Sequence, residues 1–229
     1  MEKETTSVEA KRVRVGNKRL VVRPRVVPVP VAVPAPASED EYVLQTMLTC
    51  LGNKRSLVCH IRDAADNVCK RLNKSRLRIL DGFGGSGVVS RKLSYVASSL
   101  HYNDMEEYAY LMGKCSVETP TAAQRGRIAA HIGSMNDLAA CGPYVRGFVS
   151  ELYAPADTEN IESGERCFYT QENAQIIDTL RAYISNHVED ELQSYCLVPL
   201  LNKASIHANT SGVFKGFHSE DGVGKWGGA

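Results

Sequence analysis

The segment 81–87, DGFGGSG, carries four glycines behind an aspartate. Glycines between a strand and a helix let a ligand approach the main chain closely, with free N–H groups pointing outward. Such a loop suits a tight turn, a dinucleotide, a nucleoside or a phosphate. It is not a Walker A loop, because no Gly-Lys-Ser/Thr follows. Its distinguishing feature is Asp81 followed two residues later by an aromatic, Phe83.

A second acidic residue, Asp104, follows the loop after about twenty residues. At the end of the second strand of a βαβ unit, a carboxylate can accept hydrogen bonds from both ribose hydroxyls. The alternative is a helix N-cap for the segment after it. The interval from the glycine loop favours the ribose role. A third feature is the Gly-Asn-Lys turn at 52–54, which by itself is best explained as an ordinary connection, because Gly-Asn with basic neighbours is common in turns.

The elements that must position these residues begin just before the loop. Apolar residues at helical spacing predict a helix over 57–72, and the apolar run 77–80 predicts a buried strand. A helix can start at 88, a second short strand ends at 103–104, and the segment 105–115 predicts the next helix. This order indicates a βαβ unit of a parallel sheet.

Outside this unit the pattern is less regular. The segment 122–141 is typical of a helix, 144–153 of extended chain, and 171–201 of two helices. We therefore divide the chain into three regions: a flexible basic Pro/Val-rich arm (1–38), a cofactor-binding βαβ part (39–118) and a helical recognition region (119–229).

Composition limits the class of protein. The 229 residues are 43% hydrophobic and 23% charged, as in soluble globular proteins. No apolar run approaches the ~20 residues that cross a bilayer, and the first residues lack the apolar core of a secretory signal. We expect a cytoplasmic protein without membrane contact, associated with the nucleoid if bacterial or phage.

Charge is divided unevenly along the chain. Residues 1–78 carry 16 Lys/Arg against 8 Asp/Glu, whereas residues 79–229 carry 11 against 18. A basic leading third suits a partner with a phosphate backbone, and a solvated basic tail explains it equally well. The seven cysteines form no CxxC pair and no zinc-like spacing with histidine, so we expect reduced, mostly buried thiols and no metal site.

Three segments, LGNKRSL, DGFGGSG and YND, together resemble the amino-terminal half of the Dam-type DNA adenine-N6 methyltransferases. They are similar to the family's Gly-Lys motif, its D/E-P-F-x-G-x-G cofactor loop and its ribose-binding acidic motif. Stretches starting at Phe148 and Ala204 are also similar to phage and bacterial members, so the resemblance covers roughly 45–229.

The resemblance implies a Rossmann-like, S-adenosylmethionine-dependent α/β fold, incomplete here, with an added helical recognition region. It implies double-stranded DNA as the partner, with phosphate contacts from the arm and the 54–78 segment. It assigns cofactor contacts to Lys54 near the carboxylate, to Phe83, Gly85 and Gly87 in the loop with Asp81 at its base, and to Asp104 at the ribose.

Two departures from the family pattern matter. Gly82 stands where the family has proline, and no Asp/Asn/Ser-Pro-Pro-Tyr/Phe motif occurs anywhere in the chain. That motif holds the flipped adenine and its amino group in the family. We therefore expect no catalytic residue in this chain, which would be a fragment or one half of a split enzyme that binds S-adenosylmethionine but transfers methyl groups poorly. Alternatives are an inactive cofactor- or DNA-binding remnant acting as a partner subunit, and a small-molecule methyltransferase.

The candidates for DNA contact carry basic, amide or aromatic side chains within the recognition region, and ordinary surface or packing roles are the alternative for each. They are Arg125, Arg127, His131, Arg146, Lys203, His207, Asn209, Lys215 and Phe217. The sequence leaves open the recognition sequence and the choice between restriction-modification, phage defence and regulation.

Overall fold

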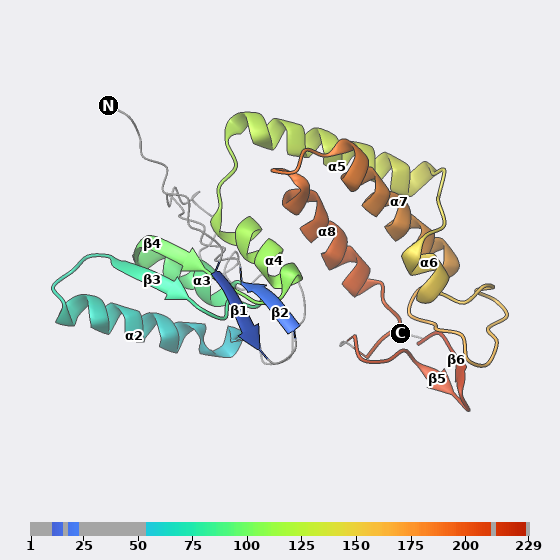
Figure 1. Ribbon diagram of the computed structural model, residues 1–229, viewed down its shortest axis with the longest axis horizontal. Helices are drawn as coiled ribbons and strands as arrows, with labels where there is room; N and C mark the ends of the chain where they lie inside the picture. The colour runs from blue at the N-terminus through green and yellow to red at the C-terminus, as the bar shows by residue number, and fades with distance from the viewer. Residues whose placement is uncertain (1–10, 16–17, 23–53, 212–213, 228–229) are drawn as a thin grey trace.

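The computed structural model describes residues 11–15, 18–22, 54–211 and 214–227 (Figure 1). Within the arm, β1 (Lys11–Val15) and β2 (Lys18–Val22) pair as an antiparallel hairpin that the sequence analysis did not predict. The rest of the predicted arm, its boundary at residue 38 and most of the Gly-Asn-Lys turn lie outside the described residues.

The predicted βαβ unit is confirmed. A short 3-10 turn, η1 (Arg55–Leu57), leads into α2 (Val58–Arg71), and β3 (Leu77–Asp81) follows. The chain then forms α3 (Val88–Leu93), η2 (Ser94–Val96), β4 (Ala97–Tyr102) and α4 (Glu107–Val117). β3 and β4 are parallel, and the last residues of the two strands, Asp81 and Tyr102, are register partners.

α3 and α4 both pack on one face of this small sheet. Side chains alternate between the two faces of a strand, and register partners share a face. Asp81 accepts a hydrogen bond from Ser90 of α3, and the ring of its register partner Tyr102 lies against Gly113 of α4. The face that carries Asp81 and Tyr102 is therefore the covered one, and Tyr102 is 2% exposed.

Within the described part of the chain, neither α3 nor α4 covers the opposite face. It carries Arg78 and Leu80 of β3 beside Ser99 and His101 of β4, and the Leu80 side chain is 69% exposed. Among the described strands β3 pairs only with β4. Parallel sheets in proteins normally have both faces covered. This part of the chain therefore holds one layer of helices on a two-stranded parallel sheet, and the fuller Rossmann-like sheet stays a prediction.

The carboxy-terminal region is helical, as predicted, with a small hairpin at its end. Its elements are α5 (Ala122–Cys141), α6 (Phe148–Leu152), α7 (Gln171–His187), α8 (Gln193–Ile206), β5 (Ser219–Glu220) and β6 (Val223–Gly224). The prediction of extended chain over 144–153 was wrong. The Asp178 carboxylate on α7 accepts hydrogen bonds from the amides of Val149 and Ser150, so a distant side chain holds the start of α6.

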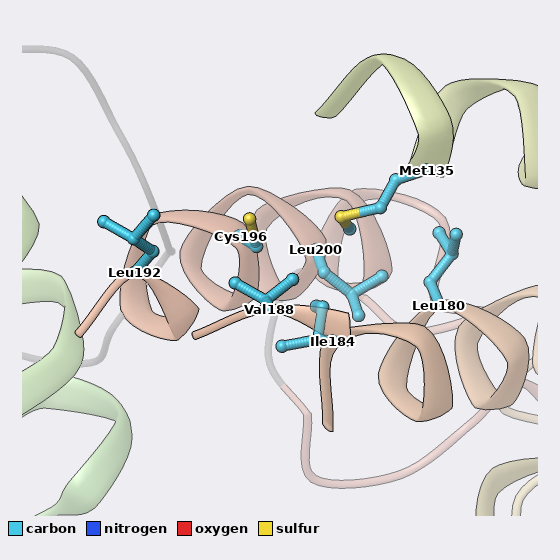
Figure 2. Packing of buried hydrophobic residues seen from close by; sticks show 7 residues of the cluster. All are labelled: Met135, Leu180, Ile184, Val188, Leu192, Cys196 and Leu200. Carbon is cyan, nitrogen blue, oxygen red and sulfur yellow. The ribbon is translucent and has the colours of Figure 1, made fainter. Parts of the chain in front are cut away.

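Helices α5, α7 and α8 enclose the main hydrophobic core (Figure 2). This core includes Met135 of α5, Ile184 of α7 and Cys196 of α8, and the last two are 0% exposed. α4 packs against α8 and also against β4, which joins the core to the sheet (Figure 1). The hydroxyl of Tyr195 on α8 donates to the carboxylate of Glu118 at the end of α4.

Neither a membrane helix nor a disulfide occurs among the described residues. No helix there combines the length and apolar character needed to cross a bilayer. All six described cysteines are free thiols, and Cys69, Cys167 and Cys196 are buried. Burial raises the pKa of the Cys115 thiol on α4 to about 12.

Replacing Ile184 with alanine tests the three-helix core. We expect Ile184→Ala to lower the free energy of unfolding by about 2–5 kcal/mol, because it removes buried methyl groups and leaves a cavity. The matched variant Ile206→Ala, at a side chain 64% exposed, should change it by about 0.5 kcal/mol or less. Urea unfolding followed by circular dichroism measures both, and equal losses would contradict this core.

Candidate functional site

The glycine loop lies at the carboxyl end of β3, and β4 holds it by main-chain hydrogen bonds. The amide of Gly84 donates to the carbonyl of Asn103 over 3.0 Å, and the amide of Asn103 donates to the carbonyl of Asp81 over 2.9 Å. Within the loop, the amide of Gly87 donates to the carbonyl of Gly84 over 2.9 Å. The loop is thus a continuation of the strand pairing.

Asp104 contacts the loop directly. One carboxylate oxygen accepts the amide of Gly85 at 2.8 Å, and the other accepts the amide of Glu106 at 2.9 Å. The second bond closes a turn just before α4. The N-cap residue of this helix is Glu106, whose side chain makes no capping hydrogen bond. Each carboxylate oxygen keeps a lone pair for a further donor. Asp104 can therefore support the loop and bind a ligand with the same group.

The buried ring of Tyr102 fixes the loop from below. It fills the space beside Gly84 in the loop and Gly113 in α4, and a Cβ at either glycine would overlap it. Its hydroxyl lies 2.7 Å from the carbonyl of Gly85 and 2.9 Å from that of Ala109. The sequence analysis missed this role, although a glycine inside a helix, as Gly113 is, signals close packing.

Polar side chains of α3 and α4 hold the base of the loop. The Ser90 hydroxyl donates to the Asp81 carboxylate over 2.6 Å. Arg91, only 3% exposed, donates to the carbonyl of Ser86 and to the hydroxyl of Ser116. Ser90, Arg91 and Ser116 were not singled out from the sequence, because their spacing forms no motif and only the fold brings them under the loop.

The outer side of the loop is open. Gly85 and Gly87 have positive φ values of 53° and 74°. A Cβ at Gly82 or Gly85 would meet nothing within 4 Å, and Phe83 is 96% exposed. The expectation of free, outward amides needs correction, because those of Gly84, Gly85 and Gly87 are hydrogen-bonded inside the protein. A ligand can reach the backbone here, but fewer amides face it than the glycine count suggests.

Lys54 lies where the chain enters α2. Its carbonyl accepts the amide of Leu57, and its side chain is exposed. Val58, four residues later, is 2% exposed and packs against Val88, the residue directly after Gly87. This contact brings the start of α2 to the same side of the sheet as the end of the loop.

Several of the predicted DNA contacts hold the fold together. Arg127 of α5 pairs with Glu189 and Glu191, and His131 lies 3.0 Å from the Tyr183 hydroxyl. The pKa of Glu189 is lowered by a hydrogen bond with its own backbone and then by Arg127.

The predicted contacts near the carboxy-terminal hairpin also have packing roles. The Asn209 side chain donates to the carbonyls of Cys167 and Lys225 and accepts the amide of Gly227, and Phe217 packs edge-on against Phe168. Lys203, His207 and Lys215 are exposed, and so is Arg125, which donates to the Pro120 carbonyl.

A separate hollow lies between α6 and the segment that leads to α7. It has a volume of about 420 Å³, and Arg146 and Arg166 line it. Two carboxylates, Glu151 and Glu165, line it as well, so it carries no clear preference for an anion. Backbone hydrogen bonds from Ala156 and Glu162 lower the pKa of Glu165. The described residues contain no group of three His, Cys, Asp or Glu side chains that could hold a metal ion.

Curated proteins similar to this chain include two methyltransferases. Over 152 residues the chain is 26% identical to the type II methyltransferase M.CviAII of Paramecium bursaria Chlorella virus 1. The aligned region makes up 65% of this chain and 43% of that protein. Over 174 residues the chain is 24% identical to the type II methyltransferase M.NlaIII of Neisseria lactamica, covering 73% and 48%. The chain is a distant relative of type II methyltransferases.

The chain spans about half the length of these relatives. No protein-family profile matches it, and the comparison with solved structures found no match. The comparisons therefore support the predicted methyltransferase relationship at the level of type II methyltransferases, and the Dam-type assignment stays a proposal.

Replacing Gly113 with alanine tests the packing beneath the loop. We expect Gly113→Ala to lower the free energy of unfolding by about 1–3 kcal/mol, because the new methyl group overlaps the Tyr102 ring. The matched variant Gly126→Ala lies inside α5 with open space at its Cβ, and should raise it by about 0.5–1 kcal/mol. Urea titration gives both values, and two variants of equal stability would argue against the Tyr102 contact.

Proposed function

We propose that this chain is the cofactor-binding and DNA-recognition part of a DNA adenine-N6 methyltransferase, with S-adenosylmethionine as its cofactor. One observation carries the proposal: the open glycine loop at the end of β3 is hydrogen-bonded to an acidic side chain at the end of the parallel strand β4. Nucleoside cofactors bind at this edge of parallel sheets. The distant relationship to type II methyltransferases supports it.

The residues present fit an adenosyl cofactor. The open side of Gly82 and Gly85 leaves room for it against the backbone, and Asp104 retains lone pairs for the ribose hydroxyls. Phe83 offers an exposed ring beside this space. Lys54 would meet the carboxylate of the methionine part, while Asp81 holds the base of the loop through Ser90.

S-adenosylmethionine, when bound, supplies an electrophilic methyl group. The acceptor, the adenine amino group, has a lone pair delocalised into the ring and must be held in line while its developing charge is stabilised. The chain contains no Pro-Pro-aromatic motif for this task. We propose that sequence outside these 229 residues supplies it, in the same polypeptide or in a second one. Among the described strands β3 pairs only with β4, and the Leu80 side chain is 69% exposed.

The proposed substrate is double-stranded DNA inside the cell. The helices α5–α8 would contribute to its recognition. The second candidate is a remnant that binds cofactor or DNA as a partner subunit without catalysis. The missing catalytic motif is the observation that favours it.

Calorimetric titration with S-adenosylmethionine tests the site. We expect Asp104→Ala to weaken binding about 10- to 100-fold, because hydrogen bonds to a charged group contribute about 1.5–3 kcal/mol. The variant Asp104→Asn keeps an acceptor for the Gly85 amide but loses the charge, so it separates loop support from ribose binding and should bind with intermediate affinity. Asp137→Ala, on the exposed surface of α5, is the control. Binding unchanged in Asp104→Ala would remove the ribose assignment.

Transfer of radiolabelled methyl groups tests the division of catalysis. We expect the purified 229-residue chain to bind S-adenosylmethionine yet leave duplex DNA essentially unmethylated, because no group in it holds the adenine amine. Scintillation counting of the recovered DNA measures this, with an intact adenine methyltransferase as the positive control. Rapid methylation by the chain alone would show that the catalytic groups are already present.

A further inference from the structure

Basic residues are dense in the sequence from the end of α2, through the connection, to the start of β3. All are exposed, and none has an ion-pair partner within the described part of the chain. This group, the 70–78 basic patch, consists of Lys70, Arg71, Lys74, Arg76 and Arg78.

The backbone beneath the patch is fixed. The amide of Lys74 donates to the carbonyl of Cys69 over 2.9 Å, and the amide of Asn73 donates to the carbonyl of Lys70 over 3.2 Å. With Asn73 at a φ of 50°, this is a Schellman end to α2. Arg78 then pairs in register with Ser99. The charges are therefore held on a defined turn, which lowers the conformational entropy that a partner must remove on binding.

Nearby acidic groups do not neutralise the patch. Between residues 67 and 103 the sequence has seven Lys/Arg and a single acid, Asp81, which lies at the far end of β3 and accepts a hydrogen bond from Ser90. On α2 itself, Asp66 pairs with Arg62. The helix dipole favours basic residues in the last turn of α2, which accounts for Lys70 and Arg71 but not for the three that follow.

The patch and the glycine loop lie at opposite ends of β3. The strand has five residues, which span roughly 16 Å at about 3.3 Å each. The patch therefore lies outside the proposed cofactor site. A cluster of unpaired Lys and Arg on a rigid turn suits a row of phosphates, and it carries no groups arranged to read base edges.

We infer that the 70–78 basic patch binds the phosphate backbone of duplex DNA without regard to sequence, as a tether separate from the methylation site. This inference rests on the proposed function and adds a specific surface to it. DNA bound there neutralises the patch and releases counterions, so affinity falls with salt in proportion to the phosphates contacted.

Fluorescence anisotropy with labelled 30-base-pair duplexes tests the tether, using the full chain between 50 and 200 mM NaCl. We expect Lys74→Gln/Arg76→Gln to reduce the slope of log affinity against log salt by about 1.8, since each phosphate contact contributes about 0.9. Because its slope is smaller, the ratio of wild-type affinity to variant affinity should fall by about tenfold between 50 and 200 mM NaCl. Two duplexes of unrelated sequence should show the same reduction.

Two controls define the outcome. Arg181→Gln/Lys225→Gln removes the same charge from α7 and from the residue that follows β6. Neither residue is among the predicted DNA contacts, so the slope should stay nearly unchanged. Lys74→Arg/Arg76→Lys keeps the charge and should retain the wild-type slope. Equal slopes in the patch and control variants, or no DNA binding by the wild type, would overturn the inference.

The cofactor site is tested separately in the same proteins. The patch variant should bind S-adenosylmethionine as the wild type does, so a loss of DNA binding alone concerns only the tether. The alternative is that the patch binds acidic residues of a second copy of this chain. Analytical ultracentrifugation without DNA tests this by measuring self-association. Salt-sensitive self-association that the patch variant lacks would replace DNA with a second chain as the partner.

Discussion

The ring of Tyr102 is the constraint on which the candidate site depends. It is buried between the glycine loop and α4, and both neighbours must be glycine where they meet it, Gly84 on one side and Gly113 on the other. Its hydroxyl reaches carbonyl oxygens of both segments. One side chain thus joins the end of β4, the loop after β3 and the next helix, so the loop conformation is a property of the packed unit.

The loop also shows how a protein satisfies a polar segment before a ligand arrives. The Asp104 carboxylate and the Asn103 carbonyl accept amides that would otherwise point into solvent. Because a carboxylate has more lone pairs than these two bonds use, stabilising the loop does not prevent Asp104 from binding a ribose. Support for the loop and binding of a ligand can therefore reside in one residue. The helix-cap alternative for Asp104 was wrong, because the N-cap residue of α4 is Glu106 and no side chain caps this helix.

The two regions of the chain differ in how fully they bury their apolar side chains. The helices α5, α7 and α8 enclose a continuous core around Ile184 and Cys196 (Figure 2). Among the residues that the structure describes, the β3–β4 sheet has α3 and α4 on one face and exposes Leu80 on the other. A parallel sheet normally buries both faces. The chain spans about half the length of the type II methyltransferases to which it is similar.

The sequence alone determined the order of elements around the site, because helical spacing and short apolar runs are local signals. It also determined that Asp81, the glycines and Asp104 end neighbouring strands. Only the tertiary structure decided which loop amides remain open, since the acceptors come from β4, and that Ser90 and Arg91 lie beneath the loop. Two predictions were wrong or incomplete for the same reason. The start of α6 depends on a hydrogen bond to Asp178, and the ion-pair partners of Arg127 lie about sixty residues away in the sequence. Periodicity reports what a residue's neighbours in sequence permit, whereas these contacts exist only after distant segments have packed.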